Sequence, residues 1–388
     1  MELPTRHRTR GIAALMCGCA FAVSLAACGS SDSADTTATG GSATSGTATA
    51  SDTAALQKAD PGWKTGTPNA RKVAFAPADN SESVRVAVIS ASDTNAYWHQ
   101  VAVAVKEVAQ ARNAKVDVFN ADFDPGKQQS QFQDALATGR YDAYIVIPVD
   151  GVSVVPMVKQ AIASGAAVVA TGDLALGPKY DTNEPQVEGM AGSVNTTNGA
   201  IGERLANLSI QACEGDDDCQ VAFIAGVATT PAEAYEAETI KRTFEGHPNV
   251  HLVAVQNGEF LADPSKAAAS NILQAHPDLD VFVTGGDQMA YGAQLAIKDA
   301  GKTDQVQTIG LGGTFQGIKQ IRADQMFGTA PLLCYDDGLY AADIALRAVR
   351  KQEVAKSVID PVEESGMPTE LTHKNIESVP FAGQFSNS

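Results

Sequence analysis

The stretch Val84–Gln100, VRVAVISASDTNAYWHQ, decides the fold of this chain. Its first six residues are apolar and mostly β-branched apart from Arg85, which is typical of a strand buried on both faces of a parallel sheet. Small and turn-forming residues follow over 90–95, and a helix is predicted from about Ala96. A strand, a polar loop and a helix in this order predict an α/β unit.

Candidate ligand contacts lie where this first strand ends. In open α/β sheets ligands bind outside the carboxyl ends of the strands, and Asn95, Tyr97 and Trp98 fall at such an end. An amide beside two aromatic rings suits a flat polar ligand, because a ring packs on its apolar face and the amide bonds its hydroxyls. The alternative is that Tyr97 and Trp98 only cap the core.

Strand-like and helix-like segments alternate from Val84 onward, which predicts parallel sheets built from right-handed crossovers. The strand candidates are 84–89, 115–119, 143–147, 167–170, 187–193, 220–225, 250–255, 281–284, 307–311 and 327–330. The helix candidates are 98–112, 126–138, 152–163, 197–213, 233–244, 264–275, 288–300, 319–324 and 335–351. About ten strands are more than one doubly wound lobe normally contains. We therefore expect two lobes with a ligand cleft between their strand ends.

The first 27 residues resemble a bacterial export signal. Met1–Arg10 carries three arginines, and residues 11–27 are small, apolar and uncharged, as in the two parts of a signal peptide. The sequence Leu25-Ala26-Ala27-Cys28-Gly29 resembles a lipobox, which implies cleavage before Cys28 and a diacylglycerol on its thiol. An ordinary secretory signal with a chance cysteine is the alternative.

The residues after Cys28 predict a tether. From Ser30 to about Asp60 the chain is Ser, Thr, Ala, Gly and Asp, which cannot bury enough apolar surface to fold. Residues 62–83 are predicted to be loop-like, and residues 28–82 together form the lipidated cysteine, the tether and the lead-in.

The charge of the chain disfavours a nucleic-acid partner. The formal net charge is −17 at pH 7, and three of the 28 basic residues lie in the expected signal. Nucleic-acid binding depends on basic groups that neutralise phosphates. An acidic surface suits a soluble protein that works outside the cell.

The order of segments from about Val84 to Val379 resembles the periplasmic sugar-binding proteins of the ribose and galactose type, which are substrate receptors of ABC importers. The matching pieces are Asn95-Ala96-Tyr97-Trp98, the run 124–150 (DPGKQQSQFQDALATGRYDAYIVIPVD), VVATGD at 168–173, Asn195 with Gly199 and Gly202, GVATTPA at 226–232, DQMAYGAQLAIKDAG at 287–301 and IGLGGT at 309–314.

The resemblance implies an α/β fold of two doubly wound parallel-sheet lobes joined by three hinge crossings, the type I periplasmic-binding-protein fold. The first lobe is expected to contain residues 84–193 and 333–357. The second is expected to contain residues 194–332 and 358–385.

In this family a pair of aromatic rings stacks on the sugar and polar groups hold its hydroxyls. The resemblance places Asn95, Tyr97 and Trp98 on the first-lobe part of that pattern. It places Asp173 on a carboxylate that accepts two hydroxyl hydrogen bonds, with a turn residue as the alternative, and Asn195 on another polar contact. Asp287 precedes the helix expected over 288–300, so it is a candidate both for ligand contact and for the N-cap.

The second lobe departs from the family pattern. Ala234, Tyr235 and Glu236 stand where an arginine is usual, and Gly286 and Gly312 replace an asparagine and an aspartate. Each lost hydrogen bond is worth on the order of 1 kcal/mol net, so we do not expect ribose or glucose held in the familiar way. Either the hydroxyls meet other residues, or the ligand is smaller or less polar. The candidate replacements are Thr229, Thr230, Glu233, Tyr235, Phe260 and Thr314.

Cys213 and Cys219 bracket a short acidic loop, and an extracytoplasmic chain permits a disulfide, which we predict. Cys334 is then left unpaired and is expected to be buried. The acidic run could hold calcium, but it lacks the spacing of an EF-hand loop. A solvated loop is favoured, and we predict no metal site and no cofactor.

Catalytic and DNA-binding motifs are lacking in the sequence: it contains no HExxH, GxSxG or GxxxxGK[ST], and no helix-turn-helix precedes Val84. We therefore predict a binding protein and not an enzyme.

The function expected is that of a monomeric, lipid-anchored receptor at the outer face of the cytoplasmic membrane. It would bind a sugar or polyol by hinge closure and meet an ABC permease. The alternatives are a ligand sensor that feeds a membrane signalling partner, and the same fold with a non-carbohydrate metabolite.

Overall fold

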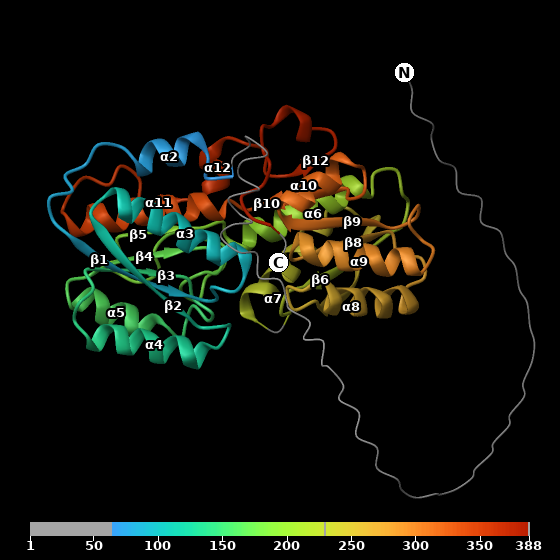
Figure 1. The fold of residues 1–388 in the computed structure, drawn as a ribbon. Coiled ribbons are helices and arrows are strands. Elements are labelled where there is room, and N and C mark those ends of the chain that lie inside the picture. Colours follow the sequence, from blue (N-terminus) through green and yellow to red (C-terminus); the bar gives the residue numbers. More distant parts are fainter. Residues whose placement is uncertain (1–63, 229, 387–388) are drawn as a thin grey trace, which may run out of the picture. The chain divides into compact units, whose positions relative to one another are not determined.

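The structure is a computed structural model that describes residues 64–228 and 230–386. The expected signal, Cys28, the whole expected tether and Thr229 lie outside the described residues. Two six-stranded sheets form the centres of two lobes (Figure 1). The predicted class, α/β with two doubly wound lobes, is confirmed.

The first sheet has the strand order β11-β5-β4-β3-β1-β2, and all of its pairings are parallel. Its strands are β1 (Val84–Ser90), β2 (Ala114–Asn120), β3 (Ala143–Val146), β4 (Ala167–Thr171), β5 (Gly192–Val194) and β11 (Val358–Ile359). Arg85 is the exposed residue of β1 and the others are buried, as expected for a strand with both faces covered.

Helices cover both faces of the first sheet (Figure 1). Val86 and Val88 of β1 share one apolar cluster with α3 (Ala96–Ala111) and α11 (Cys334–Val349). Ala87 and Ile89 point the other way, into a cluster with α4 (Pro125–Ala137) and α5 (Val155–Ala163). This alternation along β1 is the two-residue period of a strand. Helix α11 returns to the first lobe from near the end of the chain.

The second sheet has the order β12-β10-β9-β8-β6-β7, with one antiparallel pairing, between β10 and β12. Its strands are β6 (Cys219–Ala225), β7 (Val250–Asn257), β8 (Val281–Thr284), β9 (Gln307–Gly312), β10 (Gly328–Pro331) and β12 (Leu371–Thr372). Its helices are α6 (Asn198–Ala212), α7 (Pro231–Phe244), α8 (Ala262–Ala275), α9 (Asp287–Asp299), α10 (Phe315–Arg322) and the 3₁₀ turn η1 (Ile376–Ser378). Phe223 of β6 packs with α6 and α7, and Ile224 packs with α8 and α9.

The lead-in to the first lobe contains a helix that the sequence did not predict. Helix α2 (Pro68–Ala74) begins at Thr67, whose hydroxyl accepts the Ala70 N–H, and has a proline at its first position. Asp336 of α11 accepts both the Thr67 N–H (2.8 Å) and its hydroxyl (2.5 Å). A helix of seven residues is marginal alone, so contact with α11 stabilises it, and no local pattern reveals that contact.

Two strand assignments also differ from the prediction. A strand was expected over 187–193, but the observed strand is the shorter β5 (Gly192–Val194). Gly189 has a φ of 90° and turns the chain before it reaches the sheet. The first residues of 358–385, expected in the second lobe, form β11, which pairs in parallel with β5 of the first sheet. Helix α12 (Pro361–Ser365) follows and packs on α2. A two-residue strand carries almost no sequence signal. The other lobe limits stay a prediction.

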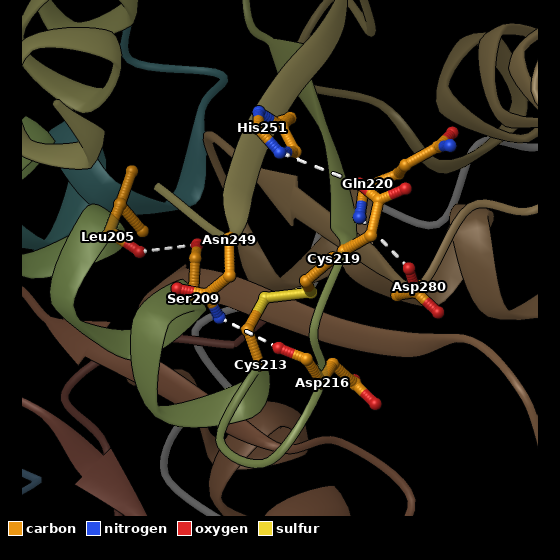
Figure 2. Close-up of a disulfide and its surroundings, with 10 residues drawn as sticks. Leu205, Ser209, Cys213, Asp216, Cys219, Gln220, Asn249, His251 and Asp280 are labelled. Atoms are coloured by element: carbon orange, nitrogen blue, oxygen red, sulfur yellow. Dashed lines mark hydrogen bonds and ion pairs between the residues drawn. A yellow bond between two sulfur atoms is a disulfide. The ribbon is translucent and has the colours of Figure 1, made fainter. Parts of the chain in front are cut away.

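Cys213 and Cys219, predicted to be bonded, are joined in the structure by a disulfide (Figure 2). The loop between them is held to β7 by the Asn249 side chain, which donates to the Asp216 carbonyl at 2.9 Å. Within the described ranges, no group of three or more His, Cys, Asp or Glu side chains could hold a metal ion. Cys334 is unpaired and buried.

Among residues 64–228 and 230–386, no helix combines the length and the apolar character needed to cross a bilayer.

Candidate ligand-binding site

The first turn of α3 brings three of the predicted residues together. The Asn95 side chain caps the helix by accepting the Tyr97 N–H at 2.9 Å, the usual task of asparagine at this position. The Tyr97 hydroxyl donates to Asp337 of α11 at 2.5 Å, and the Trp98 indole N–H donates to Asp173 at 3.1 Å. Tyr97 and Trp98 are therefore held by carboxylates as well as packed in the core.

Asp173 lies just past the end of β4, which runs between β3 and β5, at the carboxyl edge of the first sheet. It follows Gly172, whose φ of 96° a side chain would strain, and whose Cα faces the Trp98 ring. Burial raises the pKa of Asp173 to about 6, although the hydrogen bond from Trp98 favours the ionised form. The Asp173 carboxylate is thus a partly desolvated hydrogen-bond acceptor.

Three aromatic rings from both lobes meet at this edge. Phe123, from the loop after β2, stacks on Phe260, from the loop after β7, with centroids 6.1 Å apart and planes 8° apart. Trp98 meets Phe123 edge-on at 4.9 Å and Phe260 at 6.3 Å. Gly226 is required below Phe260, because a Cβ there would lie 2.0 Å from the ring. The ring of Phe260, a sequence candidate, lies in this group, and Phe123 was not among the candidates.

Helix α7 adds two carboxylates from the second lobe. Thr230 begins this helix by capping it, with its hydroxyl accepting the Glu233 N–H. Glu233 accepts the Gly226 N–H at 2.9 Å, and burial together with the charge of Asp173 raises its pKa to about 7. Burial and the charge of Glu233 raise the pKa of Glu236 well above its usual range.

Asn198, the first residue of α6, ties the two lobes together. Its amide nitrogen donates to Glu236 at 2.7 Å and to the main-chain oxygen of Asp173 at 3.2 Å. Neither Asn198 nor Asp337 was predicted, and Glu236 was noted only as a departure from the family pattern. In the sequence all three look like ordinary polar residues of predicted helices, so no local pattern indicated that they would lie close together.

Two of the predicted residues, Asn195 and Tyr235, lie elsewhere. Asn195 is buried at the end of β5, where its side-chain oxygen accepts the Ser193 hydroxyl and its N–H donates to the Ile359 carbonyl. Tyr235 packs on Tyr180 at 5.7 Å and lines a separate cavity of about 500 Å³. Neither side chain joins the group of rings and carboxylates around Trp98.

Asp287 belongs to the interior of the second lobe, and its predicted capping role is wrong. Gly286 occupies the N-cap, and no side chain caps α9. The fully buried Asp287 carboxylate instead accepts the Thr314 N–H (2.7 Å), the Thr314 hydroxyl (2.9 Å) and the Thr329 hydroxyl (2.7 Å). Gly310 and Gly317 make room for it, because a Cβ at either would lie about 2 Å from the carboxylate.

Two doubly wound parallel sheets, with contacting side chains at their carboxyl edges, define the class of two-lobed α/β binding proteins. The family model described as "Periplasmic binding protein domain" matches residues 86–353, and the chain belongs to this family. The resemblance seen in the sequence is confirmed. The family consists of binding proteins of transporters, so the chain is not an enzyme, and it implies an extracytoplasmic location.

Individual relatives are distant. The chain is 25% identical over 281 residues to the D-ribose/D-allose-binding protein of Pseudomonas aeruginosa, covering 71% of this chain and 85% of that one. It is 27% identical over 247 residues to the D-allose-binding periplasmic protein of Escherichia coli (63% and 77% covered). The crystal structure of an ABC transporter solute-binding protein from Mycobacterium smegmatis with bound glycerol has a TM-score of 0.66 at 24% identity, covering 79% of this chain and 100% of that one.

Proposed function

We propose that this chain is the lipid-anchored solute receptor of an ABC importer and that it binds a sugar or polyol between its two lobes. The observation that carries the proposal is the meeting of Trp98 and Asp173 from the first lobe with Phe260 and Glu236 from the second. Aromatic rings beside carboxylate acceptors suit a ligand with apolar faces and hydroxyl donors. The two relatives named for ribose and allose support this ligand class.

Hinge closure follows from the same contacts. The inter-lobe contacts of Asn198 with Asp173 and of Trp98 with Phe260 join the facing edges of the two sheets, and we propose that they break when the lobes open. A ligand that touches both lobes gains all its contacts in the closed state alone, so it shifts the equilibrium toward closure. The importer would then recognise the closed receptor.

A thermal-shift panel of pentoses, hexoses, polyols and amino acids tests the ligand class on residues 29–388. A ligand that binds only the native state stabilises it and so raises the melting temperature. At a ligand concentration of a hundred times Kd the stabilisation is about 2.7 kcal/mol. Stabilisation by a sugar or polyol supports the proposal. Silence across the carbohydrates combined with a shift from an amino acid would refute it.

The lipid anchor is tested on the full chain. Cys28→Ala removes the thiol that the lipobox would modify, so we expect the protein to move from the membrane fraction to the soluble fraction. Cys334→Ala is the matched control, because this cysteine is buried in the domain and its loss should leave the protein on the membrane. Unchanged partition of Cys28→Ala would contradict lipid attachment.

A further inference from the structure

We propose that the ligand carries a positive charge, as an amine-bearing sugar or polyol does, and that Asp173, Glu233 and Glu236 bind its ammonium group beside the aromatic rings. This inference rests on the proposed function, because it names the ligand class of the same site.

None of the three carboxyl groups has a cationic partner among the described residues, and their burial favours a proton on them until a cation is bound. Each accepts a hydrogen bond from a neutral donor: Asp173 from the Trp98 indole, Glu233 from the Gly226 main chain and Glu236 from Asn198. Some lysines, arginines and histidines among the described residues form ion pairs, but always with other carboxylates and never with these three. Carboxylates taken out of water need a partner of opposite charge or a proton.

Buried oxygens at this point also lack donors. Glu236 is 3% exposed and Asn198 is 2% exposed, and the Glu236 Oε2 and Asn198 Oδ1 atoms have no hydrogen-bond partner. The Asn198 amide nitrogen bonds both Glu236 and the Asp173 main chain, so these oxygens lie where the lobes meet. A sugar hydroxyl would satisfy one such oxygen without removing the charge, whereas an ammonium group has three donors and the compensating charge.

The aromatic rings adjoin the carboxylates directly. The Trp98 ring is bonded to Asp173 through its N–H. Gly226 donates to Glu233 and lies against the Phe260 ring. Faces of tryptophan and phenylalanine attract cations, by about 0.5–2 kcal/mol depending on desolvation. Rings and carboxylates therefore favour the same ligand charge.

Calorimetry with matched ligands tests the inference on residues 29–388 at pH 7.5. The pairs are D-glucosamine against D-glucose and N-acetyl-D-glucosamine, and 1-amino-1-deoxy-D-sorbitol against D-sorbitol. We expect at least one amine to bind about tenfold or more tighter than its neutral partners, the ratio that one charge-assisted contact supplies.

The other outcomes separate the inference from the proposed function. A neutral sugar or polyol that binds as tightly as its amine overturns the inference and leaves the proposed function intact. 1,4-Diaminobutane serves as an amine without hydroxyl groups. If it binds and no sugar or polyol does, the ligand is not a carbohydrate, and that part of the proposed function and of the inference is overturned. If no compound of the two series binds, the inference is contradicted, and the thermal-shift panel decides the proposed function separately.

A variant pair localises the charge effect. Glu236→Gln keeps the shape of the side chain and removes its ability to ionise, so we expect amine affinity to fall about tenfold or more beyond any loss of affinity for the neutral partners. Glu238→Gln makes the same change on the exposed face of α7 and should change neither. Unliganded Glu236→Gln should melt no lower than the parent protein, which establishes that it folds. Equal loss of amine and neutral binding in Glu236→Gln would refute the inference.

Discussion

Replacing Asp173 with alanine should abolish much of the ligand affinity without unfolding the protein. The side chain accepts a hydrogen bond from the Trp98 indole at 3.1 Å and lies at the strand edge where we expect the ligand to bind. A charge-assisted hydrogen bond to a ligand is worth about 1.5–3 kcal/mol, so Kd should rise by about 10- to 150-fold.

Two opposing effects of this substitution on stability nearly cancel. Leaving the Trp98 N–H without an acceptor costs about 1–3 kcal/mol. Against this, burial raises the pKa of Asp173 from 3.8 to about 6, so at pH 7 the ionised side chain opposes folding by up to about 3 kcal/mol. The melting temperature of the unliganded variant should therefore lie within a few degrees of the parent value.

The sign of the pH dependence gives an independent check. A carboxyl whose pKa is higher in the folded than in the unfolded state loses its proton on unfolding, so its contribution falls as pH rises. The parent protein should thus lose stability between about pH 4 and 6 through Asp173, and Asp173→Asn should lose less over that window. Calorimetric titration measures ligand affinity, and thermal melts from pH 4 to 7.5 measure stability. For Asp173→Ala, an unchanged affinity, or a fall of more than about 3 kcal/mol in the free energy of unfolding at pH 7, would refute the reasoning.

Three further changes have distinct outcomes. Asp287→Ala should lower the free energy of unfolding by about 2–5 kcal/mol, because three buried donors lose their acceptor, and chemical denaturation checks this; lost ligand binding with unchanged stability would show instead that Asp287 contacts ligand. Gly226→Ala should displace the Phe260 ring, since the new Cβ would lie 2.0 Å from it, and should weaken ligand binding in calorimetry by more than it lowers stability; equal affinity would mean that the ring does not meet the ligand. Cys213→Ser with Cys219→Ser should cost about 2 kcal/mol, the value expected for a short closed loop, with unchanged affinity, and a fall in affinity in the same melts and titrations would contradict a purely structural disulfide.

Local patterns were sufficient for most of the fold because the longer strands and helices each carry their own periodicity. Val84–Ser90 is recognisable alone, and its carboxyl end locates Trp98 and, two strands away, Asp173. Phe123 escaped prediction because it lies in the loop after β2, where no periodicity indicates a role for its side chain. The packing of the lobes, and not any local pattern, brings such residues into the site.

Residues whose role depends on distant contacts were the ones misjudged or missed. Asp287 looks like a helix cap in the sequence, but glycines far along the chain open the space that it fills. Asn198 and Glu236 are separated by 38 positions and meet through one hydrogen bond. Helix α2 depends on a partner 269 residues away. Such pairings are set by tertiary packing, to which single-sequence patterns are blind.

Asp336 has a mechanical consequence. Its buried carboxylate binds Thr67, at the entry to the folded domain, and Gln384, near the end of the chain. A pull transmitted along the chain to Lys64 would therefore be resisted at the start of α11 on the first lobe and, because the Lys64 ammonium lies over the Phe315 ring of α10, on the second lobe as well. The entry of the chain is thus fastened beside the junction of the two lobes.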